Sequence, residues 1–257
     1  MRSSRIDSRP SRARKHRPLR RALAAARAVV ESLEDRRLLS VSLTTLATFT
    51  GANGASPLSG LTHDAAGNLY GTTFGSNGDN TIYEIAAGTN KLTTLATFAG
   101  ADPAISPLLA DSAGDLFGTT TYGGNFSADQ LGSGTIFEIA AGSSKITTLA
   151  TFNGADGDTP TGALTRDATG DLYGVTSAGG ASYDGAAYEL PAGAKTVKLL
   201  ASFTAAAGTA PTAGPLLDSA GDLFGTTSYG GAYDDGTDYE VAAGAKTVAV
   251  LASFNGA

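Results

Sequence analysis

The chain has 257 residues and no cysteine, so it can bury a sizeable core, while disulfides and thiolate metal sites are excluded. Its net charge of −6 is unevenly distributed: residues 1–37 contain 12 Lys and Arg against 4 Asp and Glu, and the remainder contains 6 against 20. This asymmetry separates a basic tail, residues 1–40, from an acidic body, residues 41–257. Because phosphate binding needs clustered Lys and Arg, we do not expect the body to bind nucleic acid.

The basic tail begins with Arg, Ser and Pro and no apolar face up to Arg21, which predicts disorder. Residues 22–30, ALAAARAVV, are helix-prone, but Arg27 interrupts the apolar run. This run is a poor secretory signal and falls short of the roughly 20 residues that cross a bilayer. The tail is therefore predicted to be disordered or helical, without a transmembrane helix.

Residues 31–40, ESLEDRRLLS, form a short amphipathic segment that can be interpreted as a helix end leading into the first strand. The segment also resembles the LEPR-XLL motif found near the N-termini of large exported or surface proteins of planctomycete-type bacteria, with Asp35 where that motif has Pro. The matching residues are Leu33, Glu34, Arg36, Leu38 and Leu39. The resemblance implies a sorting or export signal and an extracellular or cell-surface location.

The acidic body consists of a sequence that recurs about every 50 residues. The phrase LATF or LASF occurs five times, with spacings of 49, 54, 51 and 51 residues. Two other phrases occur four times each, a turn such as DSAGDLFGTT and a strand-like TIFEI. The three phrases begin at Leu46, Leu95, Leu149, Leu200 and Leu251; at Asp64, Asp111, Asp167 and Asp218; and at Thr81, Thr135, Ala186 and Thr237. Periodicity of this length indicates tandem structural repeats.

Each unit contains four strand signals separated by turns of Gly, Asp, Ser or Asn. In the second unit these are a short apolar run at 107–111, an aromatic and Thr-rich run at 115–121, and alternating runs at 135–140 and 145–152. Four-stranded units of this length predict an all-β, β-propeller-like tandem repeat of four four-stranded blades, with a β-solenoid as the alternative.

The repeat phrases resemble the GloVer-type tandem repeats (choice-of-anchor family) of bacterial extracellular proteins. Those repeats read G-x-L-Y-G-T-T, then a Gly-Gly loop, then G-T-V-F-x-L. The second unit supplies GDLFGTT, Gly123-Gly124 and GTIFEI, whereas the first has Gly75-Ser76 in place of the Gly pair. The resemblance covers residues 41–257 and implies an exported or surface-anchored repeat protein with no established activity.

The fifth LATF-type phrase leaves one strand in excess of four complete blades. Residues 43–49 could serve as the outer strand of the fourth blade, but residues 247–254 already fill that place. The chain stops where earlier units continue into the next blade. We therefore expect an incomplete or open ring from a longer array, whose unclosed sheet edge could pair with another chain. A closed four-bladed ring is the alternative.

The Asp that opens each turn phrase has two interpretations. In the first, its side chain accepts backbone N–H bonds in an Asx-type turn, and the Gly three residues later takes a positive φ. In the second the loop binds calcium, which takes 6–8 oxygens, whereas the phrase supplies two carboxylates at most. We expect the turn and no cofactor. The inner Gly of the phrase is expected to allow close approach of a neighbouring backbone.

A second set of candidates follows the aromatic residue of the third strand. By alternation these carboxylates face the next blade or solvent, where they could bind a cation or sugar hydroxyls, or be ordinary solvated strand residues. They are Glu84, Glu138, Glu189 and Glu240. Two loops that combine Tyr with Asp, residues 183–185 and 233–236, are further candidates for a glycan site.

The sequence contains no pattern that indicates nucleophilic catalysis. It has no Cys nucleophile and no G-x-S-x-G elbow, and His63 is the only His of the body, without a counterpart in the other units. We therefore predict no catalytic, cofactor-binding or metal-binding residue. The predicted function is a non-catalytic binding, adhesion or envelope module whose surface ligand is a glycan or a protein. A propeller-type lyase or glycan hydrolase that uses inner-strand carboxylates is the alternative.

Overall fold

The computed structural model describes residues 43–75, 80–98, 106–124 and 132–256. The chain divides into two compact units, Met1–Thr44 and Thr45–Ala257, and every described strand lies in the second. The predicted tail with its sorting motif lies outside the described residues. Within the described ranges, no helix has the length and apolarity to cross a membrane.

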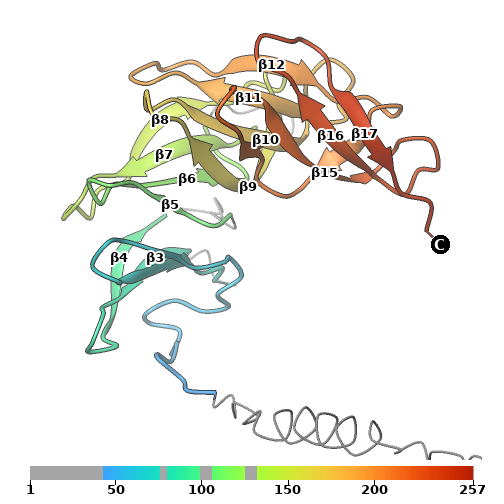
Figure 1. The fold of residues 1–257 in the computed structure, drawn as a ribbon. Coiled ribbons are helices and arrows are strands. Elements are labelled where there is room, and N and C mark those ends of the chain that lie inside the picture. The colour runs from blue at the N-terminus through green and yellow to red at the C-terminus, as the bar shows by residue number, and fades with distance from the viewer. Residues whose placement is uncertain (1–42, 76–79, 99–105, 125–131, 257) are drawn as a thin grey trace, which may run out of the picture. The chain divides into compact units, whose positions relative to one another are not determined.

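The strands form four antiparallel sheets, which we call blades 1 to 4 in chain order (Figure 1). Blade 1 contains β1 (Thr62–His63), β2 (Leu69–Thr72), β3 (Thr81–Ile85) and β4 (Leu92–Thr97). Blade 2 contains β5 (Leu109–Ala110), β6 (Leu116–Thr120), β7 (Thr135–Ile139) and β8 (Thr147–Thr151). Blade 3 contains β9 (Asp158–Arg166), β10 (Leu172–Ala178), β11 (Ala186–Leu190) and β12 (Lys198–Ser202).

Blade 4 differs from blade 3 in its first strand. Two short strands, β13 (Thr209–Pro211) and β14 (Leu216–Leu217), pair with β15 (Leu223–Tyr229). Together they occupy the place of the single long strand β9 in blade 3. The sheet continues with β16 (Thr237–Val241) and β17 (Ala249–Ser253). In every blade the pairing of the third and fourth strands shifts register at the aromatic residue, as at Ile136/Phe137. The predicted four-stranded units are confirmed.

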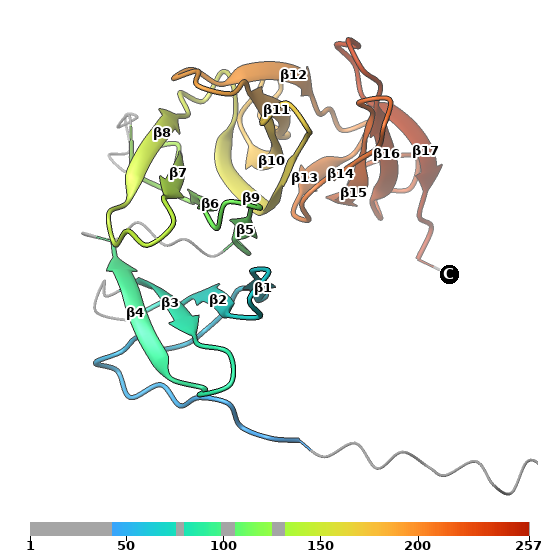
Figure 2. The ribbon, with the colours of Figure 1, turned by 60° about the vertical axis from the view of Figure 1, so that its left-hand side comes forward.

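The hydrophobic core lies between neighbouring blades, which follow one another in chain order (Figure 2). Three clusters of buried side chains join blades 1 and 2, 2 and 3, and 3 and 4. At the second junction, Ile136 and Ala150 of blade 2 pack with Leu172 and Leu190 of blade 3. The same inter-blade packing does not cover the outer face of blade 4, so the fold is an open β-propeller-like repeat.

The Phe that ends each of the first four LATF or LASF phrases packs into the following unit. Its ring meets the aromatic ring of the next third strand edge to face, with centroids 4.8–5.2 Å apart. The pairs are Phe49–Tyr83, Phe98–Phe137, Phe152–Tyr188 and Phe203–Tyr239. Residues 43–50 form no strand. Phe49 packs against blade 1, and β17 is the outer strand of blade 4, the place that the sequence assigns to residues 247–254.

The inner Gly of the turn phrase makes room for that aromatic ring. A Cβ at Gly118 would lie 2.6 Å from Cζ of Phe137, and a Cβ at Gly174 would lie 2.3 Å from the Tyr188 hydroxyl. The Gly therefore accommodates a side chain of the adjacent strand, and the expected close approach of a neighbouring backbone was wrong.

Candidate binding clefts between the blades

The turn phrase DSAGD folds as an Asx-type turn that also fixes a neighbouring hairpin. Oδ1 of Asp111 accepts the backbone N–H groups of Ala113 and Asp115, both at 2.9 Å, and Gly114 has a φ of 88°. Asp115 in turn accepts the N–H of Ala141, in the turn after the third strand, at 2.7 Å. The same bonds recur at Asp64, Asp167 and Asp218. The predicted turn is confirmed.

Hydrogen bonds within the turn favour the charged form of Asp64 and of Asp167. Burial alone would raise the pKa of Asp64, but hydrogen bonds from Asn68, Tyr70 and backbone N–H groups outweigh it, and the pKa falls below its usual range. The pKa of Asp167 is lowered in the same way by bonds from Thr169 and Asp171. Among the described residues, no group of three or more His, Asp or Glu is placed to hold a metal ion. The Oδ1 oxygens of the opening Asp residues serve the turn, since each accepts N–H groups of its own loop.

In blades 1 to 3 the carboxylate of the third strand faces the following blade, as the alternation predicts. Each of these three carboxylates lies beside the small-residue turn of the next unit and lines a cleft at the junction. Cleft 1–2 contains Glu84, cleft 2–3 contains Glu138 and cleft 3–4 contains Glu189. Their volumes are about 370, 300 and 170 Å³. Glu240, the corresponding residue of blade 4, lies opposite Phe224 on the outer face of that blade.

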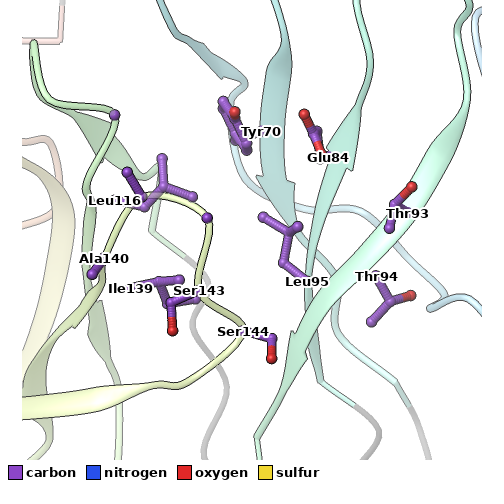
Figure 3. Close-up of a pocket in the computed structure, with 13 residues that line it drawn as sticks. Tyr70, Glu84, Thr93, Thr94, Leu95, Leu116, Ile139, Ala140, Ser143 and Ser144 are labelled. Atoms are coloured by element: carbon purple, nitrogen blue, oxygen red, sulfur yellow. The ribbon is translucent and has the colours of Figure 1, made fainter.

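Cleft 1–2 lies between the strands of blade 1 and the β7–β8 turn of blade 2 (Figure 3). Blade 1 contributes Tyr70, Glu84, Thr93, Thr94 and Leu95, which line one wall. Blade 2 contributes Leu116, Ile139 and the turn Ala140–Ser144, whose small side chains leave the rim open. The cleft thus combines one carboxylate with several hydroxyls and an apolar floor.

Tyr70 is fixed in this cleft by the turn of its own blade. Its hydroxyl donates a hydrogen bond to Oδ2 of Asp64 at 2.9 Å. Burial and this bond raise the pKa of Tyr70 to about 12, so the hydroxyl stays protonated. Glu84 forms no ion pair with any residue in the described ranges, and it lies opposite Thr93 in the register of β3 and β4.

The other two clefts carry cations where cleft 1–2 has none. In cleft 3–4, Nζ of Lys198 lies 2.7 Å from the Glu189 carboxylate and closes the space beside it. In cleft 2–3, the guanidinium of Arg166 lies 5.1 Å from the centroid of the Phe117 ring and pairs with Asp111. Of the described residues that line cleft 1–2, none is Lys, Arg or His. Of the three cleft carboxylates, Glu84 is therefore the one whose cleft has no cation among its described lining residues.

The Tyr and Asp loops are not brought to these clefts. They connect the second and third strands, whereas the clefts lie beside the turns at the other end of those strands. Tyr183 and Tyr233 are 79% and 63% exposed, and the side chain of Asp234 accepts the N–H of Gly230 within its own loop. His63 is exposed, with Nδ1 3.1 Å from the Asp64 carbonyl. The sequence did not identify Thr93 or the turn after β7 as site residues. They belong to different blades, and only the packing of blade 1 against blade 2 brings them together.

Comparisons with known proteins agree with this architecture. No curated protein matches the sequence. Similar solved structures include TolB from Acinetobacter baumannii, with 18% identity and a TM-score of 0.51 over 80% of this chain and 45% of TolB. A Mycobacterium tuberculosis puromycin-hydrolyzing peptidase matches with 13% identity and a TM-score of 0.51, over 77% of this chain and 29% of the peptidase. This chain thus spans less than half of either protein, and at these identities the likeness concerns the fold alone.

The repeat phrases themselves identify the family. The sequence matches the Gloeobacter/Verrucomicrobia repeat in two overlapping segments, residues 37–216 and 75–257. These segments include every turn phrase and every third-strand phrase, and the resemblance to GloVer-type repeats is thereby confirmed. The chain belongs to the Gloeobacter/Verrucomicrobia repeat family.

Proposed function

We propose that this chain is an exported, non-catalytic binding module that holds an uncharged, hydroxyl-rich glycan in cleft 1–2. The observation that carries the proposal is Glu84, a half-buried carboxylate without an ion-pair partner among the described residues, in a cleft of about 370 Å³. A concave site with a few convergent polar groups on an apolar floor is the usual form of a small-ligand site.

The polar groups of cleft 1–2 match the hydroxyls of a sugar. The Glu84 carboxylate accepts hydrogen bonds from two hydroxyls, and such charge-assisted bonds are the stronger ones. The hydroxyls of Thr93 and Ser143 donate and accept, and Leu95 supplies an apolar surface for the ring. Because one negative charge and no cation line the cleft, an anionic ligand is repelled. A neutral polyol fits this set of groups.

The number of carboxylates favours binding over hydrolysis. Glycoside hydrolysis uses two carboxyl groups on either side of the bond that is cleaved. Among the described residues that line cleft 1–2, Glu84 is the only carboxylate. Cleft 2–3 contains Asp115 and Glu138, but Asp115 accepts the N–H of Ala141. The lyase or hydrolase alternative would require a base and an acid from these same strands.

Export is the second part of the proposal and rests on the LEPR-XLL-like motif. Replacement of Leu38 and Leu39 by Asp removes its apolar residues without touching a blade. In cell fractionation, we expect the variant to stay in the cell and the unaltered chain to reach the surface or the medium. Equal export of both chains would contradict this part alone.

The binding proposal is tested on a glycan array with the complete chain. We expect retention of neutral glycans by the unaltered protein and at least tenfold weaker retention by Glu84→Gln. Glu240→Gln, at the corresponding position of blade 4, is the matched control and should bind as the unaltered chain does. Release of a cleaved product would instead favour the enzymatic alternative, and retention that is insensitive to Glu84→Gln would exclude cleft 1–2.

A further inference from the structure

The outer face of blade 4 exposes side chains whose counterparts are covered at the other junctions. We call this surface the blade-4 face. Phe254 is 47% exposed, whereas its counterpart Phe152 is fully buried against blade 3. Leu251 is 55% exposed, whereas its counterpart Leu149 packs against the core between blades 2 and 3. The blade-4 face consists of Leu216, Phe224, Asp238, Leu251, Ala252 and Phe254, at the positions of Leu109, Phe117, Ile136, Leu149, Ala150 and Phe152.

The opposite face of blade 1 contains the complementary pocket. Tyr83 stands where Tyr188 and Tyr239 receive Phe152 and Phe203. In blade 1 the ring that enters is Phe49, from residues 45–50, which form no strand. This segment covers the pocket incompletely: Leu61 is 52% exposed, whereas its counterparts Leu108 and Leu164 are 3% and 5% exposed.

We propose that the blade-4 face binds blade 1 of a second copy of this chain, with Phe254 against the partner subunit's Tyr83 in place of Phe49. The occupant is a second copy because this chain carries both halves of the contact. The junction of blades 3 and 4, where Phe203 meets Tyr239 with centroids 4.8 Å apart, is the template. Such a head-to-tail contact buries the exposed leucines of both faces. It differs from the pairing at a sheet edge that the sequence suggested, because faces and not backbone edges meet.

The proposed head-to-tail contact also reproduces a polar contact that is found at the junction of blades 2 and 3. Between blades 2 and 3, Arg166 lies over the Phe117 ring and pairs with Asp111. The counterpart of Arg166 in blade 1 is His63, which is exposed. The counterparts of Asp111 and Phe117 on blade 4 are Asp218 and Phe224. In the assembly the partner subunit's His63 therefore meets a carboxylate and an aromatic ring, in the same order as Arg166 does within the chain.

One residue of the blade-4 face weakens the contact. Asp238 pairs with Ala252 in the register at which Ile136 pairs with Ala150 and Ala187 pairs with Ala201. Burial of an unpaired carboxylate against apolar side chains is unfavourable. The head-to-tail contact is therefore weaker than the internal junctions, and Asp238→Ala, which restores the residue of blade 3, strengthens it.

The test is sedimentation velocity of the complete chain over a concentration series. We expect reversible association of the unaltered chain, at least tenfold weaker association of Phe254→Ser and at least tenfold tighter association of Asp238→Ala. Tyr183→Ser removes an aromatic residue that is 79% exposed away from both faces, and it should leave the association unchanged. The proposal is overturned if Tyr183→Ser weakens association as much as Phe254→Ser does, or if Asp238→Ala has no effect.

The variant Phe49→Ala distinguishes this proposal from non-specific hydrophobic association. The substitution empties the Tyr83 pocket, so association should become tighter, although it removes an aromatic residue just as Phe254→Ser does. A thermal melt of Phe49→Ala confirms that blades 1 to 4 remain folded. If the unaltered chain, Phe49→Ala and Asp238→Ala are all monomeric at every concentration, the blade-4 face has a different partner and the proposal fails. Cleft 1–2 lies at another junction, so its glycan binding is tested independently.

Discussion

The ring of Phe152, from blade 2, meets the ring of Tyr188, in blade 3, edge to face, with centroids 4.8 Å apart and planes inclined at 73°. Both side chains are completely buried. Such pairs stabilise a protein beyond the burial of their area. Because the same contact occurs at each junction, the Phe of a LATF phrase belongs by packing to the unit that follows it. Each phrase therefore supplies a strand to its own blade and an aromatic ring to the next blade.

Loss of this contact between the two rings should lower the free energy of unfolding. Truncation of a fully buried Phe leaves a cavity, so Phe152→Ala is expected to lower the free energy of unfolding by about 3–5 kcal/mol. Phe254→Ala deletes the same side chain from the same phrase, but this ring is 47% exposed. At concentrations where the chain is monomeric, the control should lose less than about 1 kcal/mol. Urea titrations of both variants measure the difference, and equal losses would refute the inter-blade packing.

The hydroxyl of Tyr188 is dispensable. It is buried and has no hydrogen-bond partner in the part of the chain that the structure describes, and Phe137 occupies the same position in blade 2 without a hydroxyl. A buried unsatisfied polar group costs about 1–3 kcal/mol relative to a satisfied one. Tyr188→Phe should therefore leave the melting temperature unchanged or raise it. A clear fall in the melting temperature would show that the hydroxyl has a partner, such as a bound water.

The same substitution changes the alkaline stability. Burial raises the pKa of the Tyr188 hydroxyl above the ordinary tyrosine value of about 10, so the folded chain keeps the proton that the unfolded chain releases. The contribution of Tyr188 to stability is therefore complete below about pH 10 and is lost as the pH rises. We expect Tyr188→Phe to lose less stability than the unaltered chain between about pH 9 and 11. Thermal melts at those two pH values measure this, with the unaltered chain as the reference.

The Asx turns should govern acid stability. Although burial raises the pKa of Asp167, hydrogen bonds from Thr169 and Asp171 lower it on balance, so its contribution is present above the unfolded pKa of about 4 and is lost as the pH falls. Asp167→Ala removes both backbone acceptor bonds and should cost about 1–2 kcal/mol at neutral pH. Asp167→Asn keeps Oδ1 and is expected to retain most of that stability while losing its acid dependence. Urea titrations at about pH 7 and 4 distinguish the two variants.

Cleft 3–4 should become a second binding site when its cation is removed. Lys198 pairs with Glu189 at 2.7 Å, at the position where Thr93 faces Glu84 in blade 1. Lys198→Thr frees the carboxylate and widens a cleft that now measures about 170 Å³. For a glycan selected on the array, the number of sites per chain should rise from one to two. An unchanged stoichiometry would show that Glu189 does not act as Glu84 does.

The sequence predicts the strands and turns of this chain because their signals are local. Asp111 and Gly114 lie within one turn, and alternation along one strand suffices to direct Glu84 away from Tyr83. The pairing of Glu189 with Lys198 depends on a register shift between Ala187 and Tyr188, which alternation does not reveal. The position of Phe49 and the clefts depend on which blades are neighbours. These features arise from tertiary packing, and short-range pattern carries no signal for them.

The central claim, that cleft 1–2 binds a neutral glycan through Glu84, is tested most directly by calorimetric titration. The array-selected glycan is titrated into the unaltered chain, Glu84→Gln and Glu240→Gln under identical conditions. The account predicts one site per chain, affinity reduced at least tenfold by Glu84→Gln and unchanged affinity for Glu240→Gln. Equal affinities of the unaltered chain and Glu84→Gln would contradict it.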